Sequence, residues 1–327
     1  MSARRPAYHS GMTDRALLLR RLALASIVVN IAIVVTGGAV RLTGSGLGCP
    51  TWPRCTGDSF VPTGELGYHS AIEFTNRMIT YVLVGVALAT LVVARRVRPV
   101  RPDVRRLALV LFIGIPAQAL LGGITVLTDL NPWVVMLHLV VSMDLIAVAT
   151  LLHRRLGEGD GPVAPLVPVV MRRLAFTVFG LTGAVLYLGT VVTGSGPHAG
   201  DAQAPRTGLD PRTMSLVHAD AVIALVLATV VLLAALHRGG APASVRRAAL
   251  PVLGIQLAQG AIGWVQYATG LPELLVGLHM LAAGLLVVAT TRMVLSTRER
   301  PLVPAEVAAV PVTNTRPLMA RGAIRTH

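Results

Sequence analysis

Four histidines of this chain lie where long apolar stretches begin, and their placement suits the binding of a flat metal-containing ring. They are His69, His138, His218 and His279. Neutral imidazole is a good ligand for haem iron, and an apolar helix bundle suits the body of a porphyrin. One isolated histidine at such a place is better explained as a hydrogen-bonded group that joins two helices. Four histidines at matched positions instead favour two ring pockets, each with two imidazoles at similar depth.

A second polar set follows the first of these histidines. Glu73, Asn76 and Arg77 come four, seven and eight residues after His69, so Glu73 and Asn76 share a helical face with it. A carboxylate beside a bound ring can act as acid, base or electrostatic stabiliser. Alternatively, Glu73 and Arg77 merely neutralise each other. The positions equivalent to Glu73, Asn76 and Arg77 after His218 are apolar: Val222, Leu225 and Val226. This asymmetry predicts a reactive first pocket and a second that holds a permanent cofactor.

The two cysteines of the chain, Cys49 and Cys55, lie in one loop with the sequence GSGLGCPTWPRCTGD. Pro50 and Pro53 can turn the chain back, and five intervening residues leave room for disulfide geometry. The compartment outside the cytoplasmic membrane is oxidising, so we expect a disulfide. A free redox-active or metal-binding pair is the alternative, although a zinc site would need two further ligands nearby.

The elements that must position these residues are membrane-spanning helices. Of 327 residues 54% are hydrophobic and 13% are charged, and mean hydropathy is +0.68. In ordinary soluble proteins roughly a quarter of all residues are charged, so the composition predicts an integral membrane protein. Apolar stretches of about 20 residues predict eight spans, at 22–41, 69–94, 107–127, 133–152, 174–194, 213–236, 248–268 and 273–295.

The basic residues, all arginine, fall mostly in alternate connections between these spans. The other connections hold only Arg41, Arg54, Arg206 and Arg212 among several carboxylates. The positive-inside rule then places both termini in the cytoplasm of a bacterial cell, with the chain in the plasma membrane. The net charge of +14 is explained by topology and by attraction to membrane lipids, and it does not indicate nucleic-acid binding.

An internal repeat divides the chain in two. A shift of 141 residues superposes Gln118, Gly122 and His138 on Gln259, Gly263 and His279, and the segment 34–37 recurs at 191–194. The predicted fold class is therefore all-α integral membrane, with eight transmembrane helices in two tandem, repeat-related four-helix bundles. The expected parts are a cytoplasmic N-terminus (1–21), a first bundle (22–152) with an external disulfide loop (42–68), a cytoplasmic linker (153–173), a second bundle (174–295) and a disordered cytoplasmic tail (296–327).

The chain resembles the haem A synthase family, in an actinobacterial-like variant. The resemblance extends from about residue 20 to 295 and rests on the run Gly37 to Pro50 (GGAVRLTGSGLGCP), the later Cys55, the segment Ile72 to Arg77 and the four histidines. It implies haem O as substrate in the first bundle, haem b as cofactor in the second, and oxidation of the haem O C8 methyl to a formyl group, giving haem A for cytochrome oxidase. It also implies a haem O synthase upstream, whereas the electron donor is unidentified.

The resemblance also implies roles for individual residues. Glu73 matches the essential carboxylate, His138 a ligand of the substrate haem, and His218 with His279 the axial pair of haem b. Cys49 and Cys55 match the paired cysteines of the external loop. One position departs from the family pattern Glu-x-x-His-Arg, because Asn76 stands where the family has histidine. Either His69 replaces that ligand from a neighbouring depth, or the substrate haem has one strong axial ligand, with Asn76 and Arg77 in supporting roles.

Two other functions remain alternatives at this point. A bis-haem electron carrier predicts two equivalent, permanently occupied pockets, but it leaves Glu73 and the cysteine loop unexplained. A secondary transporter also contains repeats, but it predicts broken helices at the membrane midplane, whereas the matched histidines lie near one face.

Overall fold

The computed structural model describes residues 14–63 and 67–301. Within them lie eight helices: α1 Asp14–Leu42, α2 Gly67–Arg96, α3 Pro102–Leu127, α4 Pro132–Arg155, α5 Val169–Ser195, α6 Pro211–Arg238, α7 Ala243–Ala268 and α8 Glu273–Ser296. All eight are long and apolar enough to cross a membrane. The eight predicted spans and the all-α fold class are therefore confirmed, and the protein is a multi-pass membrane protein. The helices extend past most predicted ends, and α1 begins at Asp14.

The helix starts follow from local sequence. Proline occupies the first position of α3, α4 and α6, where its missing N–H group is not needed and its fixed φ suits the helix. The side chain of Asn131 accepts a hydrogen bond from the Trp133 backbone, and that of Asp210 accepts one from the Thr213 backbone. These contacts satisfy free N–H groups at the starts of α4 and α6.

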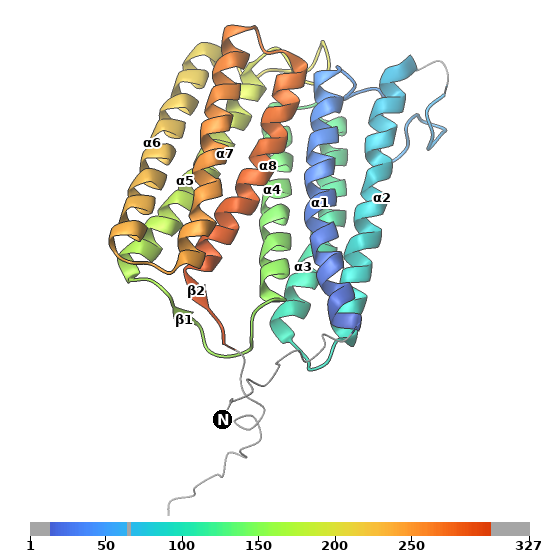
Figure 1. Ribbon diagram of the computed structural model, residues 1–327. Coiled ribbons are helices and arrows are strands. Elements are labelled where there is room, and N and C mark those ends of the chain that lie inside the picture. The colour runs from blue at the N-terminus through green and yellow to red at the C-terminus, as the bar shows by residue number, and fades with distance from the viewer. Residues whose placement is uncertain (1–13, 64–66, 302–327) are drawn as a thin grey trace, which may run out of the picture.

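The helices form two four-membered bundles side by side (Figure 1). In the first, α1 packs against α2 and α4, and α3 packs between α2 and α4; in the second, α5 packs against α6 and α8, and α7 packs between α6 and α8. Helices α4 and α8, together with α1 and α5, form the interface between the bundles. The histidine-bearing helices of each bundle are thus diagonal partners. Among the described residues, no Cα of α2 lies within 8 Å of α4, and none of α6 within 8 Å of α8.

The repeat is visible in backbone geometry as well as in sequence. Asp129 and Leu130 after α3 have φ of 50° and 58°, and their equivalents Gly270 and Leu271 after α7 have φ of 77° and 62°. The Leu130 N–H donates to Thr125 O and the Leu271 N–H donates to Gln266 O, both at 2.8 Å. Leucine rarely adopts positive φ. The shared conformation therefore marks the two turns as copies of one structure.

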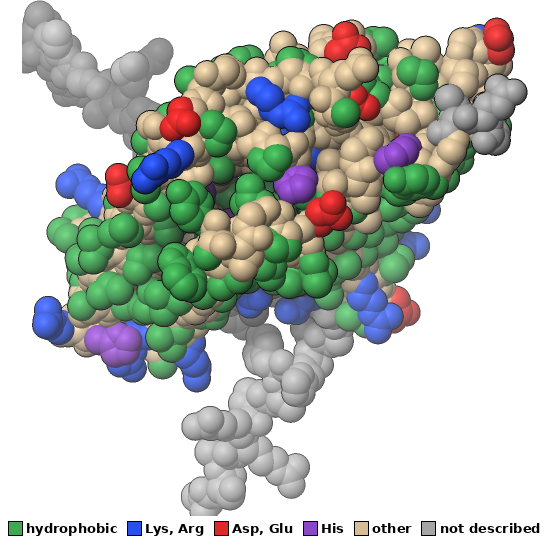
Figure 2. Space-filling model, turned by 90° about the horizontal axis from the view of Figure 1, so that it is seen from above, with side chains coloured by type: hydrophobic (Ala, Val, Ile, Leu, Met, Phe, Trp, Pro, Cys, Tyr) green, Lys and Arg blue, Asp and Glu red, His purple; other side chains and the backbone are tan. Residues whose placement is uncertain are grey.

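The two ends of the molecule differ. We call the end with the connections after α1, α3, α5 and α7 the disulfide face, and the end with the connections after α2, α4 and α6 the arginine-rich face. Figure 2 views the molecule from the disulfide face, where acidic, basic and histidine side chains are scattered among apolar and small polar ones.

The segment after α8 corrects one expectation. The predicted disordered tail was to begin at 296, but strand β2 (Arg298–Glu299) pairs antiparallel with β1 (Ala164–Pro165) of the linker. Backbone N–H groups of Gly159 and Gly161 also donate to the carbonyls of Arg300 and Pro301, both at 3.0 Å. These bonds fix the chain beyond α8. Residues 302–327 of the predicted tail, like residues 1–13 of the predicted N-terminus, lie outside the described residues.

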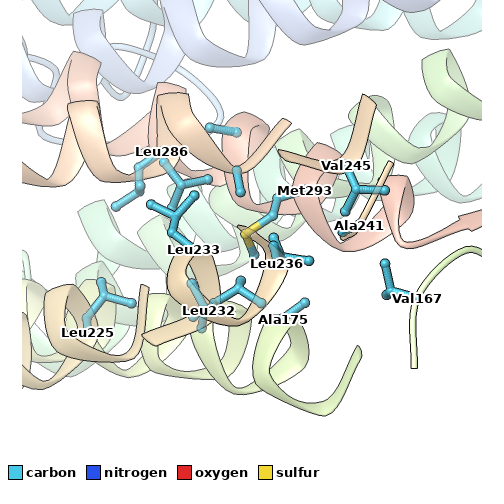
Figure 3. Packing of buried hydrophobic residues seen from close by; sticks show 14 of the residues in the cluster. Val167, Ala175, Leu225, Leu232, Leu233, Leu236, Ala241, Val245, Leu286 and Met293 are labelled. Atoms are coloured by element: carbon cyan, nitrogen blue, oxygen red, sulfur yellow. The ribbon is translucent and has the colours of Figure 1, made fainter. Parts of the chain in front are cut away.

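The apolar cores fill the part of each bundle nearer the arginine-rich face. In the second bundle, Leu225, Leu232, Leu236, Leu286 and Met293 pack together with small residues of α5 and α7 (Figure 3). An equivalent cluster in the first bundle is formed by the parts of all four of its helices, α1, α2, α3 and α4, that lie nearer the arginine-rich face. Along α7 the buried stripe changes from Val245, Ala249 and Val252 to Gln256, Gln259 and Gln266. The part of α7 nearer the disulfide face thus buries more polar side chains than the part nearer the arginine-rich face.

Candidate functional site

Glu73 lies buried in α2 with both carboxylate oxygens engaged. Oε2 accepts a 2.7 Å hydrogen bond from the backbone N–H of Cys49. Oε1 accepts from Arg77, at 2.5 Å from Nη2 and 3.1 Å from Nε. Glu73 and Arg77 therefore form the ion pair that was considered as the simpler role of Glu73. The bond to Cys49 adds a contact that the spacing on α2 did not predict.

Arg77 also holds the loop that carries the cysteines. Its Nη2 donates to the carbonyls of Cys49 and Thr51, each at 3.1 Å, and its Nη1 donates to Arg54 O at 3.3 Å. Charged hydrogen bonds of this kind are stronger than neutral ones. The pair of Glu73 and Arg77 thus fixes the loop backbone over the end of α2.

The predicted disulfide between Cys49 and Cys55 is present, and both cysteines are fully buried. Between them, the Trp52 ring lies so close to Gly123 of α3 that a side chain at residue 123 would overlap it. The loop therefore contacts both α2 and α3 and covers the first bundle at the disulfide face. Neither the apolar pattern nor a motif could have predicted that Trp52 packs on Gly123.

His138 and His279 occupy equivalent settings in the two bundles. A Cβ atom on Gly122 of α3 would lie 3.2 Å from Cε1 of His138, and one on Gly263 of α7 would lie 3.5 Å from Cε1 of His279. The matched glutamines bind the same helices: the Gln118 amide donates to His138 O at 2.8 Å and the Gln259 amide to His279 O at 3.0 Å. In both repeats a glycine makes room for the imidazole ring, and a glutamine binds the backbone carbonyl of the histidine.

His218 and His279 lie in the same bundle on diagonal helices. His218 rests on Gly189 of α5, where an added Cβ would be 3.2 Å from its Cε1. The two histidines predicted to share the second pocket are thus on opposite, non-adjacent helices of one bundle.

His69 differs from the other three histidines. It is the third residue of α2, whereas His138 and His279 are the seventh residues of α4 and α8, and His218 is the eighth of α6. Counted from the first residue of each helix, the difference is about 6 Å along the helix axis at 1.5 Å per residue. The Nδ1 atom of His69 lies 2.9 Å from Oγ of Ser45 in the loop after α1.

Asn76 lies deeper in α2 and faces α1. Its side-chain oxygen accepts a 2.8 Å hydrogen bond from Thr36 Oγ1, and an added Cβ on Gly37 would lie 3.8 Å from its amide nitrogen. Counted from His218, the corresponding residues of α6 are Val222, Leu225 and Val226. Glu73, Asn76 and Arg77 therefore form a polar group in the first bundle that the second bundle does not repeat.

The hydrogen bonding of the histidines bears on whether they could hold a haem. The Nδ1 atoms of His138, His218 and His279 are buried and lack a hydrogen-bond partner within residues 14–63 and 67–301. Buried polar atoms are nearly always satisfied, so these three imidazoles have capacity for a further partner, and haem iron fits that capacity. Imidazoles on diagonal helices, each next to a glycine that leaves room for the ring, suit a haem that lies between them.

A protein-family model matches more than half of the chain. The model of the COX15-CtaA family, described as Cytochrome oxidase assembly protein, matches residues 20–66 and 63–207. The matched residues include both cysteines, His69, Glu73 and His138, whereas His218 and His279 lie beyond them.

Individual relatives give the same result. The Heme A synthase of Bacillus pumilus (strain SAFR-032) is 33% identical over 181 residues, which are 53% of this chain and 58% of that protein. The Heme A synthase of Symbiobacterium thermophilum is 31% identical over 186 residues, with the same shares of the two chains. The chain thus matches little more than half the length of these relatives. Because the family model covers more than half of its residues, the chain belongs to the Cytochrome oxidase assembly protein family.

Proposed function

We propose that this protein is a haem A synthase, which oxidises the C8 methyl of haem O to a formyl group by successive hydroxylation and so supplies haem A for cytochrome oxidase. The names of the relatives support this. The observation that carries it is the asymmetry of the bundles. Both can present buried imidazoles to a ring, but only the first adds a buried carboxylate, an arginine and a covering disulfide loop.

In this proposal His218 and His279 hold haem b as the permanent cofactor of the second bundle. Bound there, haem b would supply one-electron transfer to the first bundle. The chain contributes orientation: Gly189 and Gly263 leave room for the imidazole rings, and Gln259 fixes the backbone of His279. The apolar core below these residues keeps water from that side.

The first bundle binds haem O as substrate. His138, whose backbone carbonyl accepts a hydrogen bond from Gln118, would be the main residue that holds the haem iron. His69 lies nearer the disulfide face and would reach the same iron only with a shift of the ring or of the start of α2. Asn76, which stands at the family's histidine position, is a hydrogen-bonding residue beside the pocket.

Glu73 is the catalytic residue of the proposal. Its carboxylate can accept or return a proton at Oε1 or Oε2 while the methyl group is oxidised. Arg77 and the Cys49 N–H hold both oxygens in place, so little reorganisation is needed. The disulfide loop limits the access of water from the disulfide face.

The proposal extends to cellular context. The arginine-rich face and both termini are cytoplasmic, and the disulfide face is external, because arginine concentrates in the connections after α2, α4 and α6. A haem O synthase would supply the substrate. Each hydroxylation of the methyl group would consume an external oxidant such as dioxygen, together with reducing equivalents from a separate electron donor.

Pigment extraction with mass analysis tests the function. The full chain is purified from cells able to make haem O, as wild type and as Glu73→Gln. Haem b together with haem O or haem A in the wild type, and loss of haem A alone in the variant, would support the proposal. Haem b only, in fixed ratio to both proteins, would instead identify a bis-haem electron carrier.

A further inference from the structure

A cavity of about 420 Å³ lies at the arginine-rich face, away from the histidines. Residues from four separate segments line it: the connection before α3, the first turns of α3, the end of α4 with the linker, and the segment after β2. Ligand-binding cavities commonly fall between about 300 and 1,000 Å³. The cavity is therefore large enough for the headgroup of a lipid or for a small metabolite.

Its charged lining has a surplus of arginine. Of two aspartates, Asp103 pairs with Arg155, and Asp160 lies 3.1 Å from both Arg155 and Arg101. Arg106 and Arg300 also line the cavity, and neither has a carboxylate partner among the residues described. The Nε atom of Arg300 is buried and lacks any hydrogen-bond partner there. Guanidinium groups with free donors suit a phosphate oxygen, which they can bind in a bidentate manner.

We propose that this cavity binds the phosphate group of an anionic phospholipid. The surface of α3 distinguishes a lipid from a free phosphate. Val110 and Ile113 follow Arg106 by four and seven residues, on the same helical face, and they are 49% and 58% exposed. An acyl chain can lie along these residues while Arg106 and Arg300 bind the phosphate. The cavity opens where α3 begins, at the level where lipid headgroups meet the apolar span.

The second bundle provides a matched control. The repeat shift of 141 residues places Arg247 at the position of Arg106, but Ser244 replaces Asp103 and Pro242 replaces Arg101. Arg247 is exposed and does not line this cavity. Its substitution removes the same charge, from an equivalent helix position at the same face, without touching the proposed site. This inference does not depend on haem chemistry.

Native mass spectrometry of the full chain in detergent tests the proposal. Wild type, Arg106→Gln with Arg300→Gln, and Arg247→Gln are each titrated with an equimolar mixture of phosphatidylglycerol and phosphatidylcholine. We expect wild type and Arg247→Gln to retain one phosphatidylglycerol preferentially. Because each arginine contributes about fivefold near a lipid surface, we expect the double variant to bind it roughly twenty-fold more weakly. If the double variant does not fold, Arg106→Gln alone, at an exposed position, should weaken binding about fivefold.

A second titration separates the two sources of phosphate. Inorganic phosphate is added to delipidated protein and followed by phosphorus NMR. Binding of phosphate that depends on Arg106 and Arg300, without selective retention of phosphatidylglycerol, would assign the cavity to a free phosphate and overturn the lipid proposal. Equal weakening by Arg247→Gln, or undiminished retention in the double variant, would overturn the site itself.

Discussion

The ion pair between Glu73 and Arg77 predicts an asymmetric response to mutation. Their side chains are 7% and 18% exposed, and removal of one partner of a buried pair costs about 3–5 kcal/mol. Arg77→Gln should incur that full cost, because Glu73 keeps only the Cys49 N–H as a donor. Glu73→Gln should cost about 1–2 kcal/mol, since Arg77 retains the carbonyls of Cys49, Thr51 and Arg54 and glutamine still offers an acceptor.

A double-mutant cycle measures this difference. The unfolding free energies of wild type, both single variants and the double variant are determined by SDS titration of the purified protein. We expect the double variant to cost no more than Arg77→Gln alone, because the carboxylate that lost its partner is also gone. Additive effects, or a larger cost for Glu73→Gln than for Arg77→Gln, would refute the described geometry.

The outcome also bears on catalysis. A mild stability cost for Glu73→Gln would leave a folded protein in which the two carboxylate oxygens are replaced by one acceptor and one amide donor. Loss of haem A formation in that protein could then be attributed to proton transfer at Glu73. A collapse of stability would instead assign Glu73 the purely structural role of holding the disulfide loop.

Three further predictions address the pockets and the loop. His279→Ala should remove most b-type haem, measured by absorbance of the purified protein, whereas His198→Ala, in a loop outside the bundles, should keep it; unchanged haem in His279→Ala would contradict the ligand assignment. Gly122→Leu should displace the His138 ring, because even a Cβ there would lie 3.2 Å from it, and should deplete haem O and haem A but not haem b. Gly180→Leu, where a Cβ meets nothing within 4 Å, is its control, and equal loss of both haem types from Gly122→Leu would argue against separate pockets. Cys55→Ser should lower the unfolding free energy by about 2 kcal/mol from the released loop entropy, and equal stability of variant and oxidised wild type would contradict this.

The helices were predictable because a bilayer imposes a minimum length and a high hydropathy on each span. The ends of the helices were harder to predict, because helical hydrogen bonding continues beyond the apolar stretch. Helix α3 begins at Pro102 although the predicted span begins at 107, and α5 begins at Val169 although the predicted span begins at 174.

Contacts between distant segments were beyond sequence reasoning. Arg41 at the end of α1 donates to the carbonyl of Thr193 in α5 at 2.9 Å and to that of His198 in the loop after α5 at 2.6 Å. Cys49 N–H binds Glu73, and Trp52 packs on Gly123. Such contacts depend on the path of a loop with no periodic pattern and on which helices become neighbours. A single sequence contains neither kind of information directly.

The internal repeat separates the residues that would hold a ring from those that would react with one. Both bundles contain a glycine beneath an imidazole and a glutamine that binds the histidine backbone. Duplicated features must serve what the bundles have in common, which in our proposal is haem binding. Glu73, Arg77 and the disulfide loop occur once and are joined by direct hydrogen bonds. A function that needed only two bound haems would not require this second group, so its position in one bundle supports our proposal that the substrate is oxidised in that bundle.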